Sequence, residues 1–145
     1  MSTAPQTYAN HAKIVPTFHL FGSAILLVLL GWTGWRLFKE PSVDSAMALS
    51  LLIVVALGYF YGRMFAVGVQ DRVIRLEERL RMERLFEGDL KGRVQDFTTE
   101  QLIGLRFASD EELPALARRV LDEGISDRKT IKQAVKSWRA DHQRI

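Results

Sequence analysis

The sequence predicts an all-α fold: a two-helix transmembrane hairpin, a charged cytoplasmic helix that continues its second span, and a small helical C-terminal unit. Two long apolar stretches within residues 18–69 indicate the spans. No proline separates the second stretch from the charged run VQDRVIRLEERLR at 69–81, so one helix can contain both. Helix-capping patterns recur from Thr98 onward and indicate the C-terminal unit.

The charged and apolar residues are segregated along the chain. Of the 20 Lys and Arg, 16 follow Val69, and so do 15 of the 17 Asp and Glu. That half is nearly neutral, so the basic balance of the whole chain does not indicate nucleic-acid binding. The chain has no cysteine, which excludes disulfides, iron–sulfur clusters and Cys-ligated zinc.

The first predicted span is residues 18–38, which follow a polar segment, 1–17. Between His19 and Arg36 there are 16 residues without charge, and at ~1.5 Å per residue the span covers a bilayer core of ~30 Å. A hairpin buried in a soluble core is the first rival, but the remaining chain is too short and polar to cover it. A cleaved signal peptide is the second, but the polar leader and the length of the apolar run argue against it.

The second predicted span is residues 46–66, in an apolar run that reaches Val69 with Arg63 as its one charge. Arg63 lies near the end of the span, where it can snorkel outward; a functional charge within the membrane is the alternative. In the link between the spans, Pro41 ends the first helix, and Ser42 or Asp44 caps the second.

The Lys and Arg counts predict the orientation of the hairpin. A link this short makes the spans antiparallel and places both termini on one side. The link offers Arg36 and Lys39, whereas five arginines lie within 72–84. Since positive residues favour the cytoplasm, we expect both termini to be cytoplasmic, in a bacterial inner membrane.

A G-x-x-x-G pattern lies in the second span. Gly58, Gly62 and Ala66 share one i+4 row, and small residues allow helices to approach closely in lipid. The row can seat the first span of the same chain or pack on another protein.

Residues 67–88 are predicted to form the charged juxtamembrane helix, with Gly88 as its stop. Val69, Val73, Leu76 and Leu80 follow a heptad spacing of 4, 3 and 4, which Glu83 ends. We call these four residues the seam and expect it to pack on the C-terminal unit or on a partner. Glu77 and Arg81 are expected to form one of the i,i+4 ion pairs. Three arginines of this helix can contact anionic lipid or a partner: Arg72, Arg75 and Arg79. A solvated face is the alternative for them.

The C-terminal unit is expected within residues 98–145. Thr98 with Gln101, and Ser109 with Glu112, fit the capping box, while Ser126–Asp127 marks a third start. Gly124 is a predicted helix stop. The expected helices are at about 100–107, 110–123 and 127–139, with the second start nearer Leu113 as an alternative because of Pro114.

The third expected helix carries a stripe of basic residues: Lys129, Lys132, Lys136 and Arg139. Three short helices with a basic last one are typical of helix-turn-helix DNA binding, but lysines occupy positions where base readers are usually Arg, Asn or Gln. Contact with lipid headgroups or an acidic partner suits the stripe better, and a solvated face is the remaining alternative.

Catalytic signatures are absent from the sequence. No Ser/His/Asp set, phosphate-binding loop or dinucleotide fingerprint occurs, so neither an enzyme nor a metal site is predicted. His11 and His19 are candidate haem or chlorophyll ligands near a membrane boundary; interfacial packing is the alternative, and no cofactor is expected.

Four segments carry a family resemblance: Gln6–His11, VQDRVIRLEERLR at 69–81, LIGLRFASDEEL at 102–113 and SDRKTIKQAVKSWRADHQRI at 126–145. With them the chain resembles a family of small bacterial membrane proteins of unknown function, over almost its whole length. The resemblance implies two spans and a cytoplasmic helical tail, and it implies no activity.

These features predict a non-catalytic accessory or scaffolding subunit of a larger inner-membrane complex, with respiratory and photosynthetic complexes as examples. The alternative is a membrane-tethered cytoplasmic adaptor or nucleic-acid-binding regulator. The expected partners are membrane lipid and other integral membrane proteins, with a second copy of the chain as an open alternative; nucleic acid is not favoured.

Overall fold

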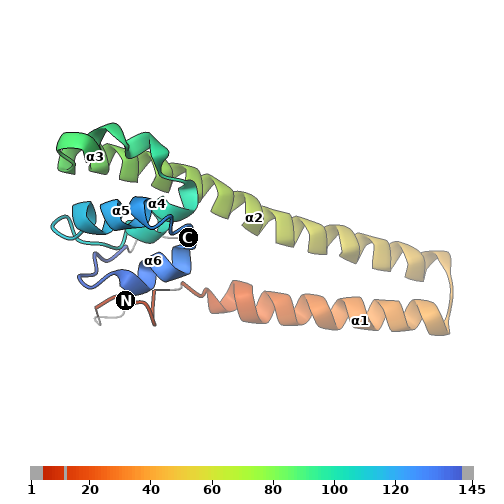
Figure 1. The fold of residues 1–145 in the computed structure, drawn as a ribbon. Helices are drawn as coiled ribbons and strands as arrows, with labels where there is room; N and C mark the ends of the chain where they lie inside the picture. Colours follow the sequence, from red (N-terminus) through yellow and green to blue (C-terminus); the bar gives the residue numbers. More distant parts are fainter. Residues whose placement is uncertain (1–4, 12, 142–145) are drawn as a thin grey trace. The chain divides into compact units, whose positions relative to one another are not determined.

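The computed structural model describes residues 5–11 and 13–141, and every regular element in these ranges is helical (Figure 1). This confirms the predicted all-α class. The elements are a π-helical turn η1 (Thr17–Gly22), α1 (Ser23–Lys39), α2 (Val43–Leu85), α3 (Gly88–Gly92), a 3-10 turn η2 (Val94–Asp96), α4 (Thr99–Leu105), α5 (Leu113–Asp122) and α6 (Arg128–Ala134).

The described chain forms two compact units, whose boundary falls inside α2. Lys13–Ala66 form the first, which we call the apolar unit. The other described residues form the second, the polar unit. Two helices, Thr17–Lys39 and Val43–Leu85, are long and apolar enough to cross a membrane, judged by length and composition alone.

In the apolar unit, the link between α1 and α2 is short and capped. The Ser45 amide donates a hydrogen bond to Ser42 Oγ at 3.1 Å, so Ser42 is the cap, as one of the two predicted alternatives. Elsewhere Tyr59 of α2 contacts η1. Its ring stacks on that of Phe18, with centroids 4.2 Å apart, and its hydroxyl donates to the Phe18 carbonyl. A Cβ on Gly22 would lie 3.1 Å from that hydroxyl, so a larger residue there would require the Tyr59 side chain to shift.

In the polar unit, the end of α2 lies beside the shorter helices (Figure 1). Its side chains share one apolar core with theirs. Met82 of α2 and Phe86, the residue that follows the helix, are part of this core. The largest fully buried side chains in it are Met82, Phe86, Phe97, Leu102, Leu105, Phe107, Leu113, Val120 and Ile131. A unit this small gains much of its burial from α2, because short helices alone enclose little apolar surface.

Local caps fix the starts of α4 and α6. Thr98 and Gln101 form both hydrogen bonds of the predicted capping box. Asp127 caps α6 by accepting a hydrogen bond from the Thr130 amide at 2.8 Å, and hydrogen bonds from Thr130 hold the pKa of Asp127 below its ordinary value. Gly124 ends α5 as predicted: its φ is 65°, and the Ile125 amide donates to the Val120 carbonyl.

The second predicted capping box forms only half. The Glu112 amide donates to Ser109 Oγ at 3.3 Å, but the Glu112 carboxylate accepts from the Lys136 and Ser137 amides instead of the Ser109 amide. Accordingly α5 begins at Leu113, the alternative that Pro114 suggested.

The last predicted helix, 127–139, is wrong in its second half. Helix α6 ends at Ala134, Val135 is extended, and residues 136–137 form a bend before Trp138, which pairs with Ala108. The Ser109 amide donates to the Ser137 carbonyl at 2.9 Å, and the Arg139 amide donates to the Phe107 carbonyl at 2.8 Å. Pairing with the segment after α4 therefore replaces the helical hydrogen bonds that residues 135–139 would have made.

The region between α2 and α4 also differs from expectation. The charged helix ends at Leu85, and Gly88, the predicted stop, instead begins α3 with a φ of 58°. Helix α3 is held to α5 by Asp89, which accepts hydrogen bonds from the Arg118 guanidinium at 2.7 and 2.9 Å. These bonds lower the pKa of Asp89 to about 2.

Candidate functional site

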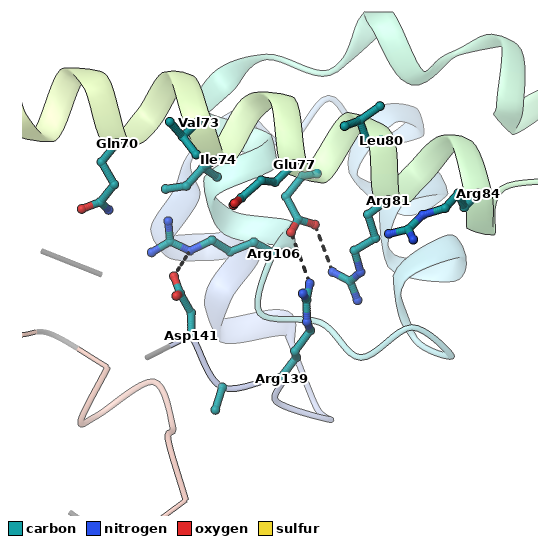
Figure 2. Close-up of a pocket in the computed structure, with 12 residues that line it drawn as sticks. Gln70, Val73, Ile74, Glu77, Leu80, Arg81, Arg84, Arg106, Arg139 and Asp141 are labelled. Carbon is teal, nitrogen blue, oxygen red and sulfur yellow. Dashed lines mark hydrogen bonds and ion pairs between the residues drawn. The ribbon is translucent and has the colours of Figure 1, made fainter. Parts of the chain in front are cut away.

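The most elaborate polar arrangement of the described chain surrounds Arg81 on α2. The Arg81 side chain is 5% exposed. Its Nη1 donates to Glu78 Oε2 at 3.0 Å, its Nε to Asp110 Oδ1 at 2.8 Å, and its Nη2 to the Ala108 carbonyl at 2.7 Å. The other oxygen of Glu78 accepts from Arg139 Nη1 at 3.3 Å, so two arginines meet on one buried carboxylate (Figure 2). We call this the Arg81 network.

This network corrects the predicted pairing of Arg81 with Glu77. Glu78 is buried, whereas Glu77 is exposed. Helix α2 turns residue 78 toward the polar unit, so that carboxylate meets the guanidinium. Paired and hydrogen-bonded charges are the form in which ionic groups are tolerated in a core.

A groove of about 640 Å³ lies beside the network, between α2 and the segment that ends at Asp141 (Figure 2). Four arginines and three acids line it: Arg81, Arg84, Arg106, Arg139, Glu77, Glu78 and Asp141. Arg106 Nε lies 3.3 Å from Asp141 Oδ2. Since most of these charges are already paired within the chain, the groove is not a strong anion site. Its apolar wall includes Val73 and Leu80 of the seam.

The seam is uncovered. Val69, Val73, Leu76 and Leu80 are 62%, 48%, 61% and 52% exposed. A different face of α2, which includes Ile74 and the Arg81 network, packs on the polar unit. The expectation that the seam packs on the C-terminal unit is therefore wrong. The alternative, that it packs on a partner, stays a prediction.

The three candidate arginines on α2 differ in their surroundings. Arg72 and Arg75 are exposed. Arg79 is half-buried, and its Nη2 lies 3.5 Å from the Gln95 carbonyl, which turns it toward η2. Only Arg72 and Arg75 are thus fully presented to the surroundings.

A protein-family model matches residues 1–145. The chain belongs to DUF6526, a family of unknown function. No curated protein and no solved structure matches it. Membership of DUF6526 therefore indicates no activity, and the surfaces of the chain are the basis for its proposed function.

In this DUF6526 chain the predicted basic stripe does not form. Lys129 is exposed on α6, but Lys136 and Arg139 lie on the non-helical segment beyond it. Lys132 is 8% exposed, and its Nζ lies 5.2 Å from the centre of the Phe107 ring. The predicted stripe required a helix that reaches residue 139. Residues 137–139 instead pair with the segment after α4, so the four side chains do not share a helix face.

The two candidate cofactor histidines lie in different units. In the polar unit, His11 Nδ1 is 2.6 Å from the Tyr8 carbonyl oxygen, and Nε2 is 3.3 Å from Lys132 Nζ. In the apolar unit, His19 Nδ1 accepts from the Val15 amide at 3.0 Å. Both rings have hydrogen-bonding neighbours within their own units, which suits the predicted alternative of packing and hydrogen bonding.

The N-terminal segment contributes more than its sequence indicates. The His11 ring stacks on Tyr8 and meets Phe107 edge to face, with centroids 5.6 Å apart in both cases. The Asp141 amide donates to Gln6 Oε1 at 2.8 Å. Residues 5–11 show no apolar periodicity. Apart from the family resemblance, nothing in the sequence therefore predicts that they pack in the polar unit.

The two glycines of the G-x-x-x-G row have open space around them. A Cβ placed on Gly58 or Gly62 would have no neighbour within 4 Å, and the close approach is between Tyr59 of α2 and Gly22 of η1 instead. Packing of α1 against Gly58 and Gly62 is therefore not seen in the structure. Packing of the row on another protein stays a prediction.

Among residues 5–11 and 13–141, no three His, Asp or Glu side chains are grouped so that they could hold a metal ion. Within the polar unit, the Arg81 network holds one face of α2 to the shorter helices, and the opposite face carries the seam.

Proposed function

We propose that this protein is a two-span protein of the bacterial inner membrane, with both termini in the cytoplasm. The lengths and apolar character of Thr17–Lys39 and Val43–Leu85 support the spans. The arginines that follow the second apolar stretch support the orientation. In this arrangement α2 crosses the bilayer and continues into the cytoplasm, where the polar unit packs on it.

We further propose that the protein is a non-catalytic accessory or scaffolding subunit of a larger membrane-protein complex. The single observation that carries this proposal is the exposed seam. At ~1.5 Å per residue, Leu80 lies roughly 16 Å along α2 from Val69, so the hydrocarbon that covers the start of the seam does not reach its end. An apolar row in water, on a helix that is already packed on its other side, is typical of a protein-docking surface.

A membrane-tethered adaptor differs from this proposal only in whether the partner is soluble, and the seam supports either. The alternative of a nucleic-acid-binding regulator was supported by the basic stripe, and that support is lost because the stripe does not form. Helix α6 has seven residues, Lys132 is buried, and Lys136 and Arg139 are not on the helix. A recognition helix presents its basic residues together in one groove.

Purification from native membranes in a mild detergent tests the proposed function. We expect the tagged full-length chain to retain other integral membrane proteins in a constant ratio and to migrate on native gels as a complex larger than a dimer. The retained proteins identify the complex by mass spectrometry. Migration as a monomer or as a homodimer without other proteins would contradict the accessory role.

A further inference from the structure

We propose that the seam pairs with the same seam of a second copy, so that two α2 helices form a short parallel coiled coil at the cytoplasmic side of the membrane. This inference rests on the proposed membrane topology and names one partner of the docking surface. Three features support the pairing: the register of the seam, the charges beside it and the face of α2 that the chain itself covers.

The register is that of a coiled coil. With Val73 at an a position, Leu76 falls at d and Leu80 at the next a, while Val69 occupies the preceding d. The central pair, Val73 at a and Leu76 at d, has the β-branched and leucine arrangement that favours a two-stranded parallel coil, whereas Leu80 at a and Val69 at d do not. In the sequence the same spacing extends back to Gly62 and Ala66, small residues that allow close helix approach in lipid.

The flanking charges are complementary in a parallel dimer. Arg72 falls at g and Glu77 at the following e, and both side chains are exposed. In a parallel coil a g residue faces the e residue five positions later in the partner helix, so Arg72 of each copy meets Glu77 of the other. By symmetry this contact forms twice.

The charges also define where the pairing ends. The next such contact would place Arg79 against Arg84, which is repulsive, and Glu83 occupies the d position after Leu80. In the structure Arg79 turns away toward the Gln95 carbonyl. The coil therefore covers the seam and stops before the end of α2.

The partner helix does not compete with the polar unit. Val73 and Glu78 are five residues apart, so their side chains point roughly 140° apart around the helix. Glu78 and Ile74 are about 5% exposed on the packed side, whereas Val73 and Leu76 are about half exposed or more. A second α2 can therefore reach the seam while the polar unit stays in place.

A second copy suits the seam better than the other occupants. Two copies in one membrane have the same orientation, and the Arg72–Glu77 contact requires that orientation. In an antiparallel pair, residues at g face each other, and Arg72 and Arg79 would repel. Two heptads are marginal in solution, but the paired spans raise the effective concentration of one seam near the other.

Disulfide cross-linking in native membranes tests the pairing, because the natural chain has no cysteine. The full-length variants Val73→Cys, Leu76→Cys and Leu80→Cys are compared with Arg75→Cys, an exposed position on the same turns outside the seam. Upon oxidation we expect disulfide-linked dimers at the three seam positions, at least fivefold more than at position 75. Equal yields at all four positions, or no dimer at any seam position, would overturn the proposal.

A charge-reversal series in the Leu76→Cys background tests the register. Arg72→Glu and Glu77→Arg, introduced singly, are each expected to lower the dimer yield severalfold, and the double variant is expected to restore it. All of these side chains are exposed, so the substitutions leave the core of the polar unit unchanged. Failure of the double variant to restore the yield would contradict the parallel register.

The outcomes separate this inference from the proposed function. Seam cross-links in a complex that retains other membrane proteins support the pairing and the accessory role, with those proteins bound to a surface other than the seam. A cross-linked dimer that retains no other protein supports the pairing and contradicts the accessory role. A different protein joined at the seam, without chain-to-chain dimers, contradicts the pairing and leaves the accessory role intact.

Discussion

Replacement of Arg81 by methionine is expected to destabilise the polar unit by about 3–5 kcal/mol, the usual cost of removing one partner of a buried ion pair. The Glu78 carboxylate, at 7% exposure, would lose its buried partner and keep only Arg139, whose side chain is 52% exposed. The Ala108 carbonyl would lose its donor as well. Methionine fills similar volume, so the loss reports the charge rather than a cavity.

Amide hydrogen exchange of the full-length chain in detergent measures this effect. Since about 1.4 kcal/mol corresponds to tenfold, exchange in α4 should accelerate more than a hundredfold. Arg119→Met is the matched control, because Arg119 forms an exposed i,i+4 pair with Glu123 and should leave exchange in α4 unchanged. Unchanged protection in Arg81→Met would show that the network does not hold α2 to the unit.

A double variant separates the two sources of the Arg81 effect. In Arg81→Met/Glu78→Leu the stranded carboxylate is gone, and replacement of a buried ion pair by apolar groups is often neutral. We expect this variant to recover at least half of the lost stability. If it is no better than the single variant, the hydrogen bond to Ala108 and the contact with Asp110 carry the effect instead.

Gly104→Val is expected to have the second largest effect. A Cβ at Gly104 would lie 2.8 Å from both Cβ and Cγ2 of Ile131, which is fully buried, and 3.4 Å from the Arg128 carbonyl oxygen. Helices α4 and α6 therefore approach each other at this glycine. Overpacking of this kind typically costs about 1–3 kcal/mol, and valine adds two methyl groups beyond the Cβ.

Thermal unfolding and exchange in α6 measure the Gly104 effect. The second variant Gly104→Val/Ile131→Ala makes room and should regain part of the loss. Gly92→Ala is the control, because nothing lies within 4 Å of a Cβ there and its φ is not positive. Equal stability of Gly104→Val and Gly92→Ala would contradict the close packing of α4 on α6.

The sequence was informative where a short-range signal decides the structure. The capping box at Thr98, the Asp127 cap and the Gly124 stop are local arrangements of backbone and side chain, and the structure has each of them. The two long apolar helices follow from length and hydropathy in the same way. These features need no knowledge of what packs on them.

The packed face of α2 could not be predicted from apolar periodicity. That face includes Glu78 and Arg81, whose burial depends on Asp110 and Arg139, residues distant in the sequence. A search for apolar rows selects the seam instead, which the chain leaves exposed. The end of α6 was missed for a related reason: the pairing of Ser109 with Ser137 outweighs the helical pattern of residues 135–139.

The central claim is that α2 crosses the bilayer and continues into the cytoplasm with the polar unit attached. Single cysteines at Val43, where α2 begins, and at Ser126, in the exposed loop before α6, test it directly in sealed inside-out vesicles. The account predicts that a membrane-impermeant maleimide labels Ser126→Cys at once and Val43→Cys only after the vesicles are permeabilised. Equal labelling of both positions in intact vesicles, or labelling of Val43→Cys alone, would contradict it.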